Sequence, residues 1–333
     1  MSQVAPDANP ARQQLARLFS PIEKELVRVE RRLRRELRSE YSRIDDLVRH
    51  AFRMGGKRLR PALVLLAAKA VGEVNRSHIV LSTVVEMIHT ATLIHDDVLD
   101  EAELRRYEPT ANARWDNEVS VLLGDYLFTH SFYLASTLGS TFACRTIGRT
   151  TNIVCEGELR QTRASGDLTI GEDEYFRIID AKTAELCACC CQLGAHYAGA
   201  SSEVETALAD YGRQLGIAFQ IADDLLDLVG DEVTVGKSLG TDLEKCKPTL
   251  PLIRLLSQVP GDSRGEVSAL LGDGESSRQA LAQRLAQSGA IDYARDKALQ
   301  HARAARDRLT VLPDSLARET LDRLTHFVVA REL

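Results

Sequence analysis

Two copies of one acidic pattern constrain the fold of this chain more than any other feature. The sequence reads DDVLD at residues 96–100 and DDLLD at residues 223–227, and each copy lies in a stretch rich in leucine, isoleucine and alanine. On a helix, carboxylates at positions i and i+4 lie on one face, about 6 Å apart along the axis. Like charges one turn apart repel each other, so the repeated pattern is favourable chiefly if cations lie between the carboxylates.

Magnesium is the natural cation for such a pattern. It takes oxygen ligands, keeps several waters and is commonly shared between a few carboxylates and a substrate diphosphate. A single DDxxD pattern is about as often a solvated helix face as a binding site. Two copies, each inside an otherwise apolar helix, favour the binding site.

Composition and periodicity predict an all-α protein. Alanine, leucine, arginine and glutamate abound, aromatic residues make up 5% of the chain, and the apolar fraction of 44% is enough for a sizeable core. We expect a loose N-terminal arm over residues 1–20 and one helical domain over 21–333. The pattern Thr169-x-x-Glu172 predicts a capping box that opens the helix carrying Lys182. The predicted helices cover about 21–52, 61–72, 77–104, 110–137, 140–164, 172–198, 203–229, 248–258, 263–289, 291–311 and 314–331.

Several classes of protein are disfavoured. The net charge of −6 and the pI near 5.8 argue against a nucleic-acid partner. No stretch approaches eighteen uninterrupted apolar residues, so no transmembrane span is predicted, and the first twenty residues lack the apolar core of a secretory signal. Seven cysteines, four of them in CACCC at residues 187–191, do not resemble a disulfide framework, so we expect a cytoplasmic protein. We interpret the CxxC of Cys187 and Cys190 as core filling rather than a metal site.

Four basic clusters accompany the two acidic motifs. A diphosphate carries up to three negative charges, and arginine and lysine beside magnesium can hold it and stabilise it as a leaving group. The clusters are GGKRLRP at residues 55–61, with Lys57, Arg58 and Arg60; the pair Arg105 and Arg106; KTA at residues 182–184; and GKSLGTDLEKCKPTLP at residues 236–251, with Lys237, Lys245 and Lys247.

These motifs together resemble one family. GGKRLRP, HTATLIHDDVLD, the paired arginines with a following PT, GDYL, KTA, FQIADDLLD and GKSLGTDLEKCKPTLP occur in the order and spacing of the trans-isoprenyl diphosphate synthases. The likeness covers about residues 40–255, and in detail it is similar to long-chain polyprenyl members such as the octaprenyl and heptaprenyl diphosphate synthases. It implies an isoprenoid-synthase-type helical bundle, usually a homodimer, with the two acidic motifs facing each other across a central cavity.

The resemblance also implies a reaction, head-to-tail prenyl transfer. Three magnesium ions would bridge both motifs and an allylic diphosphate, whose C–O bond ionises. The allylic cation is then attacked by the double bond of isopentenyl diphosphate, and proton loss restores an allylic product. Because the chemical barrier is charge separation, the task of the protein is to bind the departing diphosphate more tightly than the ester, and no protein nucleophile or base is needed.

Family roles carry over residue by residue. His95 adjoins the carboxylates but is interpreted as a supporting residue, because magnesium prefers oxygen ligands. The implied metal ligands are Asp96, Asp100, Asp223 and Asp227, supported by Asp97 and Asp224; isopentenyl diphosphate would be held by Lys57, Arg60, His89 and Arg106; and the allylic diphosphate would be held by Arg105, Lys182, Thr183, Gln220 and Lys237.

Two positions depart from the family pattern, and two rival interpretations remain. Tyr107 stands where the family usually has glycine after the arginine pair, and Cys246-Lys247 stands where it usually has Gly-Lys. Neither change removes a charge, so they concern loop geometry rather than reaction type.

A head-to-head condensing enzyme would lack the GGKRLRP, KTA and GKxxG elements, and a non-catalytic subunit would typically lose motif carboxylates.

Product length is expected to depend on the turns before the first motif. Ala91 and Thr92 are small where short-chain members carry aromatic residues, which favours a long product over farnesyl or geranylgeranyl diphosphate. Each helical turn rises about 5.4 Å, comparable with one extended five-carbon unit. A long apolar product also implies contact with a membrane surface at release. The wall of the expected tunnel continues the Asp96 face through Thr92, Ile88, Val85 and Leu81, and Phe128 and Phe132 are candidates for its floor. Ordinary helix packing is the alternative for this face.

Overall fold

The computed structural model describes residues 10–53, 56–105, 108–229, 247–260, 265, 267, 270, 271 and 274–330. These residues are helical almost throughout, which confirms the predicted all-α fold class. The chain forms two compact units: unit 1 comprises residues 1–147, 190–206 and 312–321, and unit 2 comprises residues 148–189, 207–311 and 322–333. The expectation that residues 21–333 act as one domain stays a prediction.

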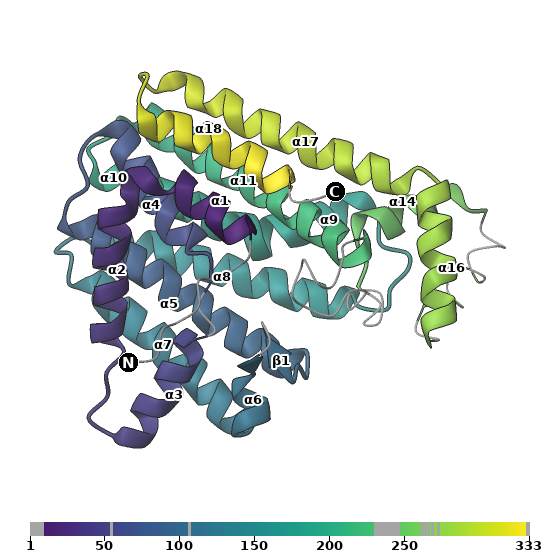
Figure 1. Cartoon of the computed structure of the whole chain (residues 1–333), viewed down its shortest axis with the longest axis horizontal. Coiled ribbons are helices and arrows are strands. Elements are labelled where there is room, and N and C mark those ends of the chain that lie inside the picture. The colour runs from purple at the N-terminus through teal and green to yellow at the C-terminus, as the bar shows by residue number, and fades with distance from the viewer. Residues whose placement is uncertain are drawn as a thin grey trace. The chain divides into compact units, whose positions relative to one another are not determined.

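Unit 1 is built around helix α5, which carries the first acidic motif. Helix α5 packs against α7, α4 and α2 (Figure 1). Helix α4 is apolar on all sides, and its residues from Pro61 to Ala68 are buried, as expected for a central helix. The elements are α1 (Pro10–Leu18), η1 (Ser20–Ile22), α2 (Glu23–Glu36), α3 (Ser42–Arg53), α4 (Leu59–Val71), α5 (Arg76–Leu99), β1 (Leu104–Arg105), β2 (Glu108–Pro109), α6 (Ala111–Arg114) and α7 (Asn117–Ser136).

Helix α5 is long and apolar enough to cross a membrane by length and composition. Among the described residues it is the one helix that passes this test, and 78% of its apolar window is buried inside the protein. Its start is fixed by a capping box, in which Asn75 accepts from the N–H of Ser77 at 2.9 Å and His78 Nδ1 accepts from the N–H of Asn75 at 2.9 Å. These features are those of a core helix.

Unit 2 packs around α11, which carries the second acidic motif. Its core joins Tyr175 and Ile179 with Ile217, Ile221 and Leu225. The elements that lie wholly or partly in unit 2 are α8 (Thr141–Ala164), α9 (Glu172–Ile179), the π-helical turn η2 (Asp180–Ala184), α10 (Glu185–Tyr197), α11 (Ser202–Val229), α14 (Leu250–Gln258), α16 (Gly274–Gln287), α17 (Ala290–Arg308), η4 (Leu309–Val311) and α18 (Leu316–Val329).

The structure corrects two local predictions. The expected loose arm is helical from Pro10, and Leu15 and Phe19 are buried at 4% exposure, because their i, i+4 spacing forms an apolar stripe. The capping box at Thr169 is wrong: α9 begins at Glu172 with Gly171 before it, and the backbone N–H and hydroxyl of Thr169 both donate to Asp167. Because Thr169 bonds to Asp167 in this local turn, its side chain does not cap the first turn of α9.

The CACCC segment lies in the core. Cys187, Cys189, Cys190 and Cys191 are all buried, which agrees with their interpretation as small core-filling residues. Burial raises the pKa of the Cys189 thiol to about 12. A thiol with so high a pKa is unreactive at neutral pH.

Candidate active site

The first acidic motif lies at the C-terminal end of α5. Asp100 caps the helix, and the chain leaves it through a Schellman motif. In this motif the N–H of Ala102 bonds to the carbonyl of Asp97 at 2.9 Å, and the N–H of Glu101 bonds to the carbonyl of Val98 at 3.2 Å. Glu101 has a φ of 50°, a left-handed conformation that costs a non-glycine residue about 1 kcal/mol. The end of α5 is therefore fixed within the motif.

The second motif also lies at a helix C-terminus. Residues 223–227 belong to the last two turns of α11, and neither α5 nor α11 has a basic residue in its last turn. The C-terminal end of a helix carries partial negative charge, so carboxylates there oppose both the macrodipole and each other. Asp96, Asp100 and Asp223 are half-buried, whereas Asp227 is only 2% exposed. A divalent cation at either helix end would offset both effects.

The donor set of each motif fits magnesium. Within the described part of the chain, no three His, Cys, Asp or Glu side chains lie close enough to form a metal site by themselves. Magnesium is usually held by one or two carboxylates, with waters and substrate phosphates completing its octahedron. Asp96 and Asp100, one helical turn apart, can supply the one or two carboxylates that magnesium needs from the protein.

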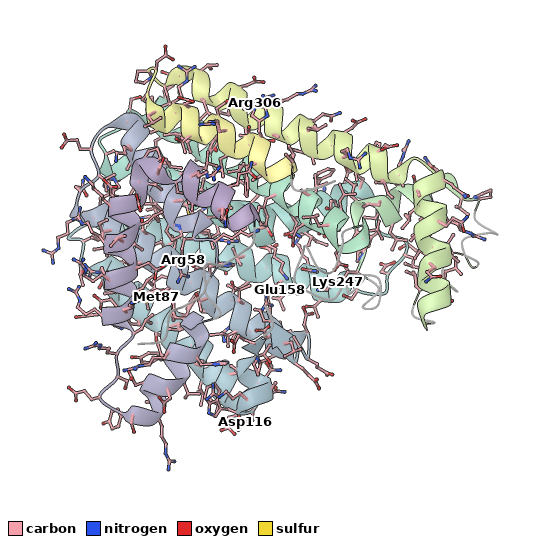
Figure 2. All side chains as sticks on the ribbon, in the orientation of Figure 1. Arg58, Met87, Asp116, Glu158, Lys247 and Arg306 are labelled. Carbon is pink, nitrogen blue, oxygen red and sulfur yellow. The ribbon has the colours of Figure 1, made fainter. Side chains whose placement is uncertain are left out.

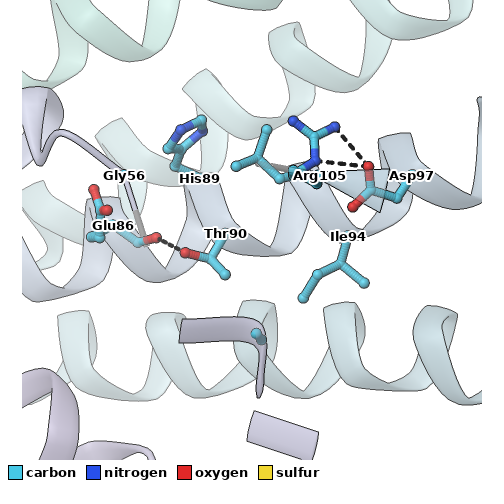
Figure 3. A pocket seen from close by; sticks show the side chains of 9 residues that line it. Gly56, Glu86, His89, Thr90, Ile94, Asp97 and Arg105 are labelled. Atoms are coloured by element: carbon cyan, nitrogen blue, oxygen red, sulfur yellow. Dashed lines mark hydrogen bonds and ion pairs between the residues drawn. The ribbon is translucent and has the colours of Figure 1, made fainter. Parts of the chain in front are cut away.

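A small pocket in unit 1 gathers several candidate residues (Figure 3). Its volume is about 20 Å³, room for about one water molecule. His89 and Thr90 from the middle of α5, Asp97 from its end and Arg105 from β1 line this pocket together with Gly56 and Glu86. The structure thus brings together His89 and Arg105, which the sequence assigned to two different diphosphates.

Arg105 is held by the first acidic motif. Its Nε and Nη2 both lie 2.7 Å from Asp97 Oδ1. Dashed lines mark the two contacts in Figure 3. The hairpin positions the arginine: β1 pairs antiparallel with β2, with Arg105 opposite Glu108. Asp97 is 1% exposed, so the carboxylate of this ion pair is shielded from solvent, and it orients the guanidinium at the pocket. Arg106 and Tyr107, also singled out in the sequence, lie outside the described residues.

The GGKRLRP segment is anchored by its first arginine. Arg58, labelled in Figure 2, adopts a left-handed φ of 53° before α4. Its guanidinium donates to Glu30 and Glu86 at 2.5 Å each. Burial by itself would lower the pKa of Arg58, but Glu86 and then Glu30 outweigh burial, so the pKa is raised. Lys57 is exposed, and Arg60 Nε is buried without an acceptor among the described residues. Arg60 Nε is therefore a donor that an anion can satisfy.

The KTA segment forms the π-helical turn η2. Lys182 pairs with Glu158 of α8, which Figure 2 labels. Thr183 donates to Gln220 Oε1 at 2.8 Å, and Gln220 Nε2 donates to Asp224 Oδ1 at 2.8 Å. A short hydrogen-bonded chain therefore links this turn to the second acidic motif.

Asp224 is oriented from a second side. The hydroxyl of Tyr175 donates to Asp224 Oδ2 at 2.7 Å, and both side chains are buried. Both carboxylate oxygens of Asp224 thus accept hydrogen bonds, which suits a supporting role better than metal ligation. Of the last basic cluster, Lys237, Lys245 and Cys246 lie outside the described residues, whereas Lys247 is half-buried.

Comparison with known proteins assigns this arrangement to a family. A model of the family described as "Polyprenyl synthetase" matches residues 41–287. The chain belongs to the polyprenyl synthetase family. It is 38% identical over 299 residues to an octaprenyl diphosphate synthase of Escherichia coli (strain K12), which covers 89% of this chain and 93% of that protein.

Solved structures of family members share the fold. A decaprenyl diphosphate synthase from Rhodobacter capsulatus is 38% identical, with a TM-score of 0.90 and coverage of 95% of this chain and 99% of that one. A polyprenyl synthase from Caulobacter crescentus CB15, complexed with calcium and isoprenyl diphosphate, is 36% identical, with a TM-score of 0.91 and coverage of 96% and 98%. These likenesses confirm the family that the motifs indicated.

The residues expected to set product length lie in unit 1 of this polyprenyl synthetase. Ala91 and Ile88 are buried at 1% exposure, and Thr92 is half-buried, with its hydroxyl donating to the carbonyl of His89 at 2.8 Å. Phe128 and Phe132 on α7 are half-buried, with ring centroids 5.3 Å apart. Their roles in chain length stay predictions.

His95 contacts α7, and its supporting role at the metal site stays a prediction. Its Nε2 lies 3.1 Å from the carbonyl of Val121 and 3.6 Å from Asp125. A Cβ at Gly124 would lie 2.2 Å from His95 Nε2, so the glycine of the GDYL segment makes room for this ring.

Sequence reasoning missed the partners of the candidate residues. Tyr175, Glu158 and Glu86 contact Asp224, Lys182 and Arg58, respectively, and none of the three belongs to a recognised motif. The one available signal was Tyr175 on the apolar face of an amphipathic helix, because a buried tyrosine hydroxyl usually has a partner. Its partner lies 49 residues away in the sequence and could not be named.

Proposed function

We propose that this polyprenyl synthetase adds isopentenyl diphosphate units head to tail to an allylic diphosphate and releases diphosphate, giving a long-chain all-trans polyprenyl diphosphate. Family membership and the octaprenyl and decaprenyl diphosphate synthases among its relatives support this function. One observation carries this proposal: both carboxylate motifs lie at the ends of helices that have no basic residue in the last turn. Arg105 lies in unit 1 with the first motif, and Lys182 lies in unit 2 with the second motif.

The residues take part through charge rather than covalent chemistry. The C–O bond of the allylic diphosphate breaks, and its electron pair leaves with the diphosphate. The double bond of isopentenyl diphosphate then attacks the allylic carbon, and the proton lost from the adduct passes to the released diphosphate. Arg105, Lys182 and Lys237 would hold the departing diphosphate, and Thr183 and Gln220 would flank the cation.

Isopentenyl diphosphate would be held by the GGKRLRP segment and its neighbours. Lys57, Arg60, His89 and Arg106 are the proposed donors. The buried Nε of Arg60, which has no acceptor among the described residues, supports an anion here. Arg58 instead pairs with Glu30 and Glu86, so its charge is already neutralised within unit 1.

Asp96, Asp100 and Asp223 would hold magnesium, with three ions expected for a complete site, and Asp227 would join them if its buried carboxylate becomes accessible. When bound, magnesium supplies positive charge that stabilises the diphosphate as a leaving group. The calcium bound to the Caulobacter crescentus polyprenyl synthase supports a divalent cation. Asp97 and Asp224 orient neighbouring groups through Arg105 and Gln220.

Product length and assembly complete the proposal. Ala91 and Thr92 would leave room for a growing chain along α5, past Ile88 and towards Phe128 and Phe132. We further propose a cytoplasmic homodimer that needs no nucleic acid and that touches a membrane surface only to release its apolar product.

The decisive variants are Asp96→Asn and Asp223→Asn, each of which removes one charge from one motif. Both should lower kcat by at least about a hundredfold with substrates and magnesium saturating, because each removes a ligand that stabilises the leaving group. Glu156→Gln on the exposed face of α8 is a matched control that should keep full activity. Near-normal turnover by either aspartate variant, or by the wild type in excess chelator, would contradict the proposal.

A further inference from the structure

One arginine bridges the two ends of the π-helical turn that carries Lys182 and Thr183. In η2 the N–H of Glu185 donates to the carbonyl of Asp180, five residues earlier. Arg213 on α11 binds the side chains of the same two residues: Nη1 donates to Asp180 Oδ1 at 2.6 Å, and Nη2 donates to Glu185 Oε2. A single guanidinium thus joins the two residues that the π-type backbone bond joins.

This bridge distinguishes the π turn from an α-helix. With 3.6 residues per turn, residues five apart in an α-helix project about 140° apart around the axis. A π turn closes with bonds between residues i and i+5 and brings them to one side. Arginine presents a planar fork that can bind two acceptors at once in fixed directions, which a lysine ammonium lacks. Arg213 therefore stabilises the π register over the α register.

The charges around Arg213 are balanced in this register. Burial by itself would lower the pKa of Arg213, but Asp180 and then Glu185 outweigh burial and raise it. Glu185 also accepts from the hydroxyl of Thr150 at 3.4 Å. In the α register one of the two carboxylates, Asp180 half-buried or Glu185 buried, would lose its ion pair with Arg213.

Residues along one face of α11 contact η2 and the helix before it. Gly216 faces Ala184, Gln220 accepts from Thr183, and Asp224 accepts from Tyr175 of α9. The residues of α11 that make these contacts are Arg213, Gly216, Gln220 and Asp224, spaced by three, four and four, which places them on one helix face.

Helix α8 approaches the same turn. A Cβ at Gly157 would lie 2.7 Å from the backbone nitrogen of Lys182 and 2.9 Å from Ala181 Cβ. The turn is therefore packed tightly at a glycine of α8 and at a glycine of α11. A change of register would therefore disturb both of these close contacts.

We propose that Arg213 is a positioning residue for prenyl transfer: it holds η2 in the π register and so sets Lys182 and Thr183 relative to the second acidic motif. Arg213 acts through these residues and binds protein carboxylates rather than substrate. The catalytic part of this inference rests on the proposed function, whereas the structural part can be tested without substrate.

The structural test is hydrogen exchange of the free protein. Arg213→Lys keeps the charge and removes the fork, so amides of a peptide covering residues 180–186 should exchange at least about tenfold faster, while peptides from α17 keep their rates. Arg177→Lys is the matched control, because Arg177 is exposed on α9 and pairs with Glu174 away from the turn. Unchanged exchange over residues 180–186 in Arg213→Lys would overturn the proposal.

The kinetic test separates positioning from general stability. Arg213→Lys should lower kcat/KM for the allylic diphosphate about ten- to a hundredfold and leave the KM for isopentenyl diphosphate unchanged. In a Lys182→Ala/Thr183→Ala background the same change should have no further effect. Equal losses in both backgrounds would overturn the positioning role. If Arg213→Lys does not fold, Asp180→Ala takes its place, because it removes one of the two acceptors of the bridge. A wild type that transfers no prenyl group, together with faster exchange in Arg213→Lys, would refute the proposed function and leave the structural role standing.

Discussion

Replacing Gly216 by alanine tests the packing of α11 on the π turn. The added Cβ would lie 2.6 Å from Ala184 Cα, whereas ordinary contacts begin at 3.4 Å, so restoring an ordinary contact requires the two backbones to separate by about 0.8 Å. Alanine gains about 0.5–1 kcal/mol over glycine within a helix, but overpacking costs about 1–3 kcal/mol. The contact is with main-chain atoms, so the second effect should win and the free energy of unfolding should fall by about 1–2 kcal/mol.

The same displacement should reach Thr183, one residue before Ala184. A shift near 1 Å of a substrate-holding group can cost up to about a hundredfold in rate, so we expect kcat/KM for the allylic diphosphate to fall at least tenfold. Denaturant unfolding and initial rates with labelled isopentenyl diphosphate measure the two effects. Gly171→Ala is the control, because nothing lies within 4 Å of its Cβ, and it should cost less than about 1 kcal/mol. Wild-type stability and kinetics in Gly216→Ala would refute the packing argument.

Three further changes test other parts of the account. Tyr175→Phe removes a buried hydrogen bond to a carboxylate and should lower the free energy of unfolding by about 1.5–3 kcal/mol in denaturant titrations; a loss below about 0.5 kcal/mol would show that the bond is not formed. Glu101→Gly relieves a left-handed residue and should raise the thermal midpoint, with a gain of up to about 1 kcal/mol, and a lower midpoint would contradict the strained helix end. Ala91→Phe should shorten the products to about farnesyl or geranylgeranyl size, because a ring exceeds the space left by a methyl group; long products from a folded variant would show that the chain grows elsewhere.

The sequence predicted the two motif helices closely. Expected at 77–104 and 203–229, they occur as α5 (Arg76–Leu99) and α11 (Ser202–Val229). Long apolar periodicity is a strong signal, and the clustered carboxylates on these helices indicated the family chemistry. The early end of α5 could not be predicted, because Glu101 takes a left-handed conformation that the sequence usually marks with glycine.

The π turn and its contacts were beyond a pattern-based prediction. Residues 172–198 were expected to form one helix, and a single π turn changes the phase of the apolar pattern too little to be recognised. Arg213 lies 33 residues from Asp180 and 28 from Glu185, so its bridge appears only once the helices are packed. The positions of charged residues in the sequence do not indicate which of them form ion pairs in the fold.

The most direct test of the central claim is to size the products of the purified chain. The protein is incubated with labelled isopentenyl diphosphate, farnesyl diphosphate and magnesium, and the extracted products are dephosphorylated and separated by length. We expect a narrow distribution of all-trans chains well beyond geranylgeranyl, formed only when magnesium is present. Products no longer than geranylgeranyl would contradict the long-chain assignment, and incorporation that persists in excess chelator would contradict the role given to the two acidic motifs.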